Sequence, residues 1–264
     1  TYYTLKVKMC GISKVETIPA VVEAKPDYMG LVFAPSKRQV TVDQAKTLVE
    51  ELHKQYGNLY SRDEVQCSND VVQDGAVIGA VQEGTATGDA HEGILTSTEN
   101  ASPTLIHQEA IKTVGVFVNE TLENLVTIAT EVNLDVVQLH GDEDEAFIQS
   151  LKERTNVEIW KAVQIRSAAD AEAWIDSSAD MLLFDAYHKD ERGGTGEVFD
   201  WSCLDEFERP FMLAGGIDST NVARAIRTVR SYGIDISSGI ETDGVKDNEK
   251  ITAFTKLVRT IAMP

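Results

Sequence analysis

The chain has 264 residues, 42% of them hydrophobic, and a formal net charge of −19. Such an acidic surface repels phosphate backbones and anionic lipid headgroups, so we expect neither nucleic-acid nor membrane partners. No apolar run approaches the roughly 18 residues that a membrane-spanning helix requires. The three cysteines (Cys10, Cys67 and Cys203) are odd in number and lack the spacing of metal ligands, which argues against a disulfide framework and against a zinc site. We therefore expect the protein to reside in the reducing cytoplasm.

Apolar runs typical of strands alternate with helical patterns along the chain. Pro19 must fall in the opening turn of the first helix, which therefore begins near Glu16 or Thr17. Thr41 and Gln44 form a capping-box pattern that opens the second helix. The predicted strands cover residues 5–10, 29–33, 113–118, 136–140, 158–163, 181–185, 211–214 and 234–237, and the later helices residues 122–129, 145–154, 168–175, 220–229 and 248–261.

Eight predicted strands, each followed by a helix or by room for one, indicate the α/β fold class. The pattern predicts a parallel (β/α)8 TIM barrel as a single domain over residues 1–264. A doubly wound sheet shows the same alternation, and periodicity alone does not separate the two.

Residues 57–108 break the pattern, because they are polar, acidic and rich in glycine, without a helical period. A loop of this length is uncommon inside a compact domain, so we interpret it as an insertion between the second helix and the third strand. Gly75 and Gly79, beside β-branched pairs, suggest a small hairpin. An insertion at this point would emerge at the N-terminal face of a barrel, opposite the face that binds ligands.

Several predicted strands end in residues able to do chemistry. Cys10 ends the first strand just before Gly11, and His140 and Asp185 end two others; Arg38 lies in the loop after the second strand. In a parallel barrel these ends converge on one face. A lone cysteine more often packs in a core. The prediction that Cys10 belongs to a ligand site therefore depends on Arg38, His140 and Asp185 at the other strand ends.

The last two predicted strands end in small residues. Gly215 and Gly216 follow the seventh strand, and Ser237, Ser238 and Gly239 end the eighth. Small residues let backbone N–H groups approach a phosphate closely. Either run alone could simply turn the chain, but their joint placement favours a phosphate site.

A set of short segments, in a specific order and spacing, covers the chain except for residues 57–108. The segments include Lys8-Met9-Cys10-Gly11-Ile12, Ser36-Lys37-Arg38, Val137-Gln138-Leu139-His140-Gly141-Asp142, Leu183-Phe184-Asp185-Ala186, Gly193-Gly194-Thr195-Gly196, Leu213-Ala214-Gly215-Gly216-Ile217 and Asp235-Ile236-Ser237-Ser238-Gly239-Ile240-Glu241. Together they resemble the phosphoribosylanthranilate isomerase family of tryptophan biosynthesis. The resemblance implies a (β/α)8 barrel and an Amadori rearrangement of N-(5-phosphoribosyl)anthranilate to 1-(2-carboxyphenylamino)-1-deoxyribulose 5-phosphate, with no cofactor and no metal.

The resemblance also assigns roles to residues. Asp185 would be the general acid and Cys10 the general base, and a cation such as Arg38 or His140 would help to form the thiolate. Arg38 matches the residue that pairs with the anthranilate carboxylate. For His140 two roles stay open, orienting the substrate or neighbouring side chains and packing as a core histidine. Asp235 matches a position near the substrate, and a strand-end hydrogen-bonding partner is its alternative.

Gly194 is expected to join the phosphate site, and residues 186–199 resemble a lid over the substrate.

Two other functions remain open from the residues. The histidine-pathway isomerase runs the same chemistry on the same fold, but it uses an aspartate where this chain has Cys10. A non-enzymatic ligand-binding barrel is the other alternative, disfavoured by the presence of both proton-transfer residues, Cys10 and Asp185. We expect a monomer or a homodimer.

Overall fold

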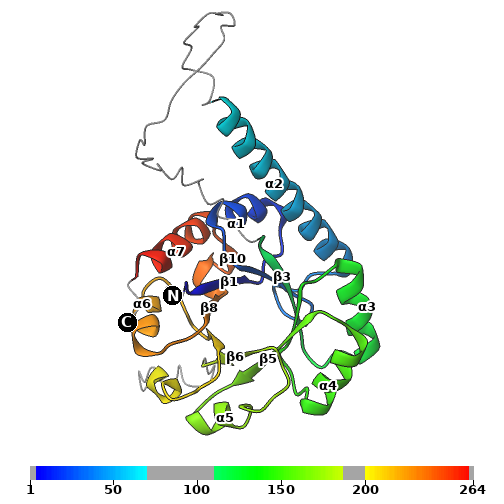
Figure 1. Ribbon diagram of the computed structural model, residues 1–264, viewed down its shortest axis with the longest axis vertical. Helices are drawn as coiled ribbons and strands as arrows, with labels where there is room; N and C mark the ends of the chain where they lie inside the picture. Colours follow the sequence, from blue (N-terminus) through cyan, green and yellow to red (C-terminus); the bar gives the residue numbers. More distant parts are fainter. Residues whose placement is uncertain (1–3, 70–109, 187–199, 262–264) are drawn as a thin grey trace, which may run out of the picture. The chain divides into compact units, whose positions relative to one another are not determined.

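Eight parallel strands form a closed barrel in the order β1 to β8 (Figure 1). This computed structural model describes residues 4–69, 110–186 and 200–261. The predicted (β/α)8 barrel is confirmed, and the closed ring excludes a doubly wound sheet. The strands are β1 (Lys6–Cys10), β2 (Tyr28–Val32), β3 (Lys112–Phe117), β4 (Val136–Leu139), β5 (Glu158–Gln164), β6 (Met181–Asp185), β7 (Phe211–Ala214) and β8 (Gly233–Ile236).

Helices surround the barrel on its outside (Figure 1). Pro19 lies in the first turn of α1, as predicted. Ser167 and Asp170 form a capping box at the start of α5, which ends at Glu172 and is shorter than predicted. The helices are α1 (Ile18–Ala24), α2 (Val42–Asn69), α3 (Leu122–Val132), α4 (Glu145–Arg154), α5 (Ala168–Glu172), α6 (Val222–Thr228) and α7 (Asn248–Thr260), with short 3-10 turns η1 (Val15–Thr17), η3 (Trp201–Leu204) and η4 (Ser238–Ile240) and a small hairpin of β9 (Glu241–Thr242) and β10 (Val245–Lys246).

Alternate residues of each strand separate two apolar cores. Val7 and Met9 of β1 belong to the core between the barrel and the helices. Lys8 and Cys10, which alternate with them, therefore face the barrel interior. The interior core is small, and it consists of Tyr28, Val114, Val136, Trp160, Ala162, Met181, Leu183, Met212 and Ala214.

Helix α2 continues to Asn69, beyond the predicted start of the insertion at residue 57. The expectation of non-helical chain from this point is therefore wrong for residues 57–69. Because that stretch contains no proline and no glycine after Gly57, the backbone hydrogen bonds can continue through polar residues.

The hairpin predicted around Gly75 and Gly79 lies outside the described residues. Contacts divide the chain into one unit of residues 1–57 and 110–264 and a second of residues 58–109.

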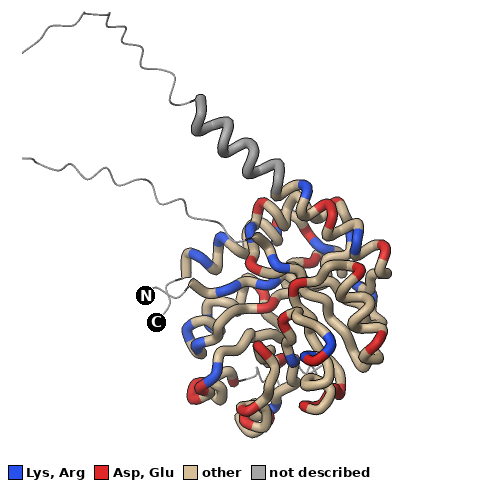
Figure 2. The backbone as a smooth tube through the Cα atoms, turned by 45° about the vertical axis from the view of Figure 1, so that its right-hand side comes forward, with Lys and Arg blue, Asp and Glu red and all other residues tan. Residues whose placement is uncertain are grey.

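Asp and Glu residues are distributed along the backbone of the barrel's helices and loops, with Lys and Arg residues interspersed among them (Figure 2). The helices in the described part of the chain all lack the combination of length and apolar character that a membrane span requires.

We predict that replacing residues 58–109 by a flexible linker of about ten Gly and Ser residues keeps turnover within about three-fold of the full chain. The reason is that all eight barrel strands lie outside this segment, and loop-closure entropy depends weakly on loop length. Turnover and the circular dichroism of the excised protein are the measurements. A folded protein with lost turnover would show that the segment contributes to the site.

Candidate active site

Cys10 is the last residue of β1, and two glycines leave room around it. It pairs in register with Gly30 of β2, where an added Cβ would lie 2.7 Å from the Cys10 sulfur. Gly11 has a φ of +80°, and a Cβ there would lie 2.5 Å from Cδ of Arg38. The chain can therefore leave β1 in a left-handed turn while Arg38 packs against it.

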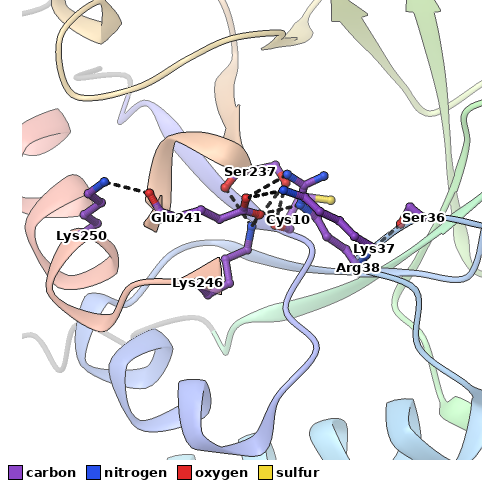
Figure 3. Close-up of polar contacts among 8 residues, drawn as sticks. All are labelled: Cys10, Ser36, Lys37, Arg38, Ser237, Glu241, Lys246 and Lys250. Atoms are coloured by element: carbon purple, nitrogen blue, oxygen red, sulfur yellow. Dashed lines mark hydrogen bonds and ion pairs between the residues drawn. The ribbon is translucent and has the colours of Figure 1, made fainter. Parts of the chain in front are cut away.

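A buried carboxylate, Glu241, holds Arg38 beside this turn (Figure 3). Arg38 donates from Nε and Nη2 to the two carboxylate oxygens over 2.5 and 3.0 Å, and Lys246 donates to Oε1 over 2.8 Å. Lys37 adds a longer contact of 3.4 Å. Burial alone would raise the pKa of Glu241, but hydrogen bonds from Arg38 and Lys246 outweigh it and lower the pKa to about 2.

Hydrogen bonds link the Glu241 cluster to the end of β1. Lys246 donates to the backbone carbonyl of Ser237 over 2.8 Å, and the Ser237 hydroxyl donates to the carbonyl of Cys10 over 3.1 Å. The structure thus brings together three residues expected at the site, Cys10, Arg38 and Ser237. Glu241 lies in one of the segments that resemble the family, but no role was expected for it. No sequence pattern pointed to Lys246.

Asp235 lies one layer deeper, paired with Lys8. The Lys8 ammonium is 3.1 Å from Oδ1 of Asp235, and Lys8 is wholly buried. Burial raises the pKa of the Cys10 thiol, and it outweighs the opposing effect of Lys8 and Lys246. The sequence suggested Arg38 or His140 as the cation beside the thiol. The alternation of Lys6 and Lys8 with apolar residues was the signal that could have pointed to Lys8.

His140 and Asp185 meet on another part of the same rim. His140 Nε2 is 3.5 Å from Oδ2 of Asp185, and Gln138 Nε2 is 3.0 Å from His140 Nδ1. The Gln138 side chain, only 1% exposed, therefore contacts one ring nitrogen of His140 while the other faces Asp185, and the two neighbours fix the orientation of the imidazole.

A cavity of about 530 Å³ opens beside His140, along the loops that follow β3 and β4 and the C-terminal half of β5. Lys161 holds the loop after β4: it donates to the carbonyl of Gly141 over 2.7 Å, approaches Glu143 at 3.4 Å and lies over the ring of Trp174. Both Lys161 and Glu143 are buried, so this pair fixes the backbone that follows His140.

The loops after β7 and β8 pack against each other. A Cβ on Gly239 would collide with the carbonyl oxygen of Ile217, so only glycine fits there. Gly215 and Gly216 have φ of +100° and +65°, and Asn221 donates to the carbonyl of Gly216 over 2.7 Å. Gly194 lies outside the described residues, as does the predicted lid from residue 187 onward. In the described ranges, no three His, Cys, Asp or Glu side chains form a group able to hold a metal.

Comparison with known proteins identifies the family. The family model described as N-(5'phosphoribosyl)anthranilate (PRA) isomerase matches residues 66–257. The N-(5'-phosphoribosyl)anthranilate isomerase of Thermoanaerobacter sp. (strain X514) is 38% identical over 259 residues, which cover 97% of this chain and 99% of the relative. The chain belongs to the phosphoribosylanthranilate isomerase family.

Solved structures of this family share the fold. A crystal structure of phosphoribosyl anthranilate isomerase from Thermotoga maritima matches with a TM-score of 0.68 and 28% identity, over 97% of this chain and 99% of that one. A second crystal structure, of a phosphoribosyl anthranilate isomerase in complex with reduced 1-(o-carboxyphenylamino)-1-deoxyribulose 5-phosphate, matches with a TM-score of 0.65 and 26% identity, over 97% of this chain and 99% of that chain. Monomers generated from the dimeric Thermotoga maritima enzyme match with a TM-score of 0.66 and 27% identity, over 97% of this chain and 100% of that chain.

We predict that Glu241→Gln lowers the free energy of unfolding at neutral pH by about 1–3 kcal/mol, because it removes the charged acceptor of Arg38 and Lys246. Since the pKa is lowered from 4.5 to about 2 by folding, the stabilisation is complete above the unfolded value and is lost as pH falls toward the folded value. Urea unfolding should therefore show the difference from wild type shrinking across that acidic window.

The matched control is Glu153→Gln, which changes an exposed carboxylate on α4 and should leave stability within about 0.5 kcal/mol of wild type. A Glu241→Gln effect that stays constant down to the folded pKa would contradict the assigned ion pairs.

Proposed function

We propose that this chain catalyses the isomerisation of N-(5-phosphoribosyl)anthranilate to 1-(2-carboxyphenylamino)-1-deoxyribulose 5-phosphate in tryptophan biosynthesis, with Cys10 and Asp185 as the proton-transfer groups. The observation that carries this assignment is the placement of a thiol and a carboxyl group at the ends of β1 and β6, in a barrel of this family. These two strands are separated by β7 and β8 around the ring, which leaves space for a substrate between the groups. The family match favours this isomerase over the histidine-pathway enzyme and over a non-enzymatic barrel.

The reaction requires one acid and one base. Asp185 donates a proton to the ring oxygen as the C1′–O bond breaks, and the nitrogen lone pair forms an iminium. The Cys10 thiolate then removes the C2′ proton, and the electrons of that bond flow to the iminium to give an enolamine. A proton added at C1′ and loss of the C2′ hydroxyl proton give the ketone. Proton gains and losses balance, as an isomerisation demands.

Arg38 is suited to the anthranilate carboxylate. It uses Nε and Nη2 on Glu241, so other N–H groups of the guanidinium remain for a second carboxylate. Arg38 and Lys246 carry two positive charges against the one negative charge of Glu241, and the excess positive charge favours an anion.

His140 and Asp235 are assigned supporting roles. His140 Nε2 faces the Asp185 carboxyl group and orients it toward the substrate. Asp235 is anchored by Lys8 below the rim and is proposed to line the substrate site.

The substrate phosphate is proposed to bind between the loops after β7 and β8, at Gly215, Gly216, Ser237, Ser238 and Gly239, with Gly194 from the loop after β6. Within the described residues, the backbone N–H groups of Gly216, Ser238 and Gly239 donate to no protein acceptor, so they remain available to a phosphate. Glycine at 239 permits the close packing of the two loops. We propose that the protein acts in the cytoplasm as a monomer or a homodimer, without a cofactor.

We predict that Cys10→Ala and Asp185→Asn each reduce turnover by about 10² to 10⁴-fold with the fold intact, because each removes one positioned proton-transfer group. The measurement is the loss of phosphoribosylanthranilate fluorescence, with circular dichroism to verify folding. Cys203→Ala is the matched control, since Cys203 lies on η3, away from the strand ends, and it should retain turnover. Near wild-type turnover in either site variant would remove that residue from its role.

We also predict that Gly216→Val raises the Michaelis constant by about ten-fold or more, because a β-branched side chain strains a backbone with positive φ beside the N–H groups. Inorganic phosphate should compete with substrate in wild type and compete more weakly in the variant. An unchanged Michaelis constant and unchanged competition would place the phosphate elsewhere.

A further inference from the structure

Lys8 is a charged residue in the barrel interior that the proposed chemistry does not use. It stands two residues before Cys10 on the same face of β1, and it has no exposed surface. An ammonium group is costly to bury, so a position such as this needs a charged partner.

That partner is Asp235, on the strand that closes the barrel. Lys8 and Asp235 are directly paired in the β1–β8 register, and their side chains meet at 3.1 Å. Asp235 has a side chain only 9% exposed, so water screens this pair weakly. The contact anchors the ammonium group on the face of β1 that Lys8 shares with Cys10.

We propose that Lys8 is a positioning residue for the isomerisation, which holds the Cys10 side chain and stabilises its thiolate, while Asp235 keeps Lys8 in place and charged. The proposal rests on the role of Cys10 as the base. Its alternative is that Lys8 serves only as a structural counterion for Asp235.

The charged groups facing Cys10 come from several elements. Lys8 comes from β1, Asp235 from β8 and Lys246 from β10, while Arg38 packs on the neighbouring Gly11 and is largely neutralised by Glu241. Lys8 is the cation that most strongly opposes the effect of burial on the thiol.

The neighbours of Lys8 favour its charged form. Burial would lower the pKa of Lys8, but Asp235 and Cys10 outweigh it and raise the pKa above the ordinary value. Removing Lys8 should therefore leave the thiol in a buried site without its main cation, and the thiolate should form only at higher pH.

The test is a pH titration of the Cys10 thiolate by ultraviolet absorbance, in a Cys67→Ser/Cys203→Ser background, together with kcat/KM against pH. In Lys8→Met, the titration and the rising limb of kcat/KM should both move up by about one pH unit or more. At a fixed pH below the limb, this shift is a ten-fold loss of kcat/KM. Lys6→Met is the matched control, because Lys6 lies at the far end of β1 beside Asp27, and both curves should stay in place.

Lys8→Met leaves Asp235 buried without its cation, which could unfold the protein or itself disfavour the thiolate. Lys8→Met/Asp235→Asn removes both charges with little change of volume, and an upward shift smaller than that of Lys8→Met is expected in it, because Asp235 itself disfavours the thiolate. A thiol that titrates at the wild-type pH in the double variant would overturn the proposal and leave Lys8 as a counterion. A shifted titration with an unshifted kcat/KM limb would instead overturn Cys10 as the base.

Discussion

The pairing of the first strand with the last is the constraint on which the site depends. Residues 8–10 and residues 235–246 lie at opposite ends of the sequence, and only closure of the ring between β1 and β8 brings them together. The closure places an ammonium group opposite a carboxylate inside the barrel and links Ser237 to Cys10 at the rim. The geometry of the proposed site therefore depends directly on closure of the barrel.

The proposed site gathers positive charge locally in a strongly acidic protein. The full chain carries a net charge of −19, and salt screens exposed charges from one another beyond about 8 Å at physiological ionic strength. Around Cys10, by contrast, three cations (Lys8, Arg38 and Lys246) are held by two carboxylates (Asp235 and Glu241) in partly or wholly buried positions. The short range and low exposure of these contacts let them dominate over the surface charge.

The sequence predicted the strands well because each carries an apolar run, and it located most candidate residues because barrel sites lie at strand ends. Asp185 and Cys10 were found in this way. The pairs Lys8–Asp235 and Arg38–Glu241 were not, because their partners are 227 and 203 residues apart and no local pattern encodes strand register. The helical extension to Asn69 was missed for a different reason. A helix segment without an apolar face has no periodicity to detect, so residues 57–69 look like a loop in sequence alone.

The first-to-last strand contact also sets an order of events during synthesis. Translation proceeds from the N-terminus at roughly 5–20 residues per second, so the 227 residues between Lys8 and Asp235 take about 11–45 seconds to make. During that interval the nascent chain carries Lys8 without the carboxylate that permits its burial. The Lys8–Asp235 pair and the β1–β8 seam of the barrel therefore form only after nearly the whole chain has been made.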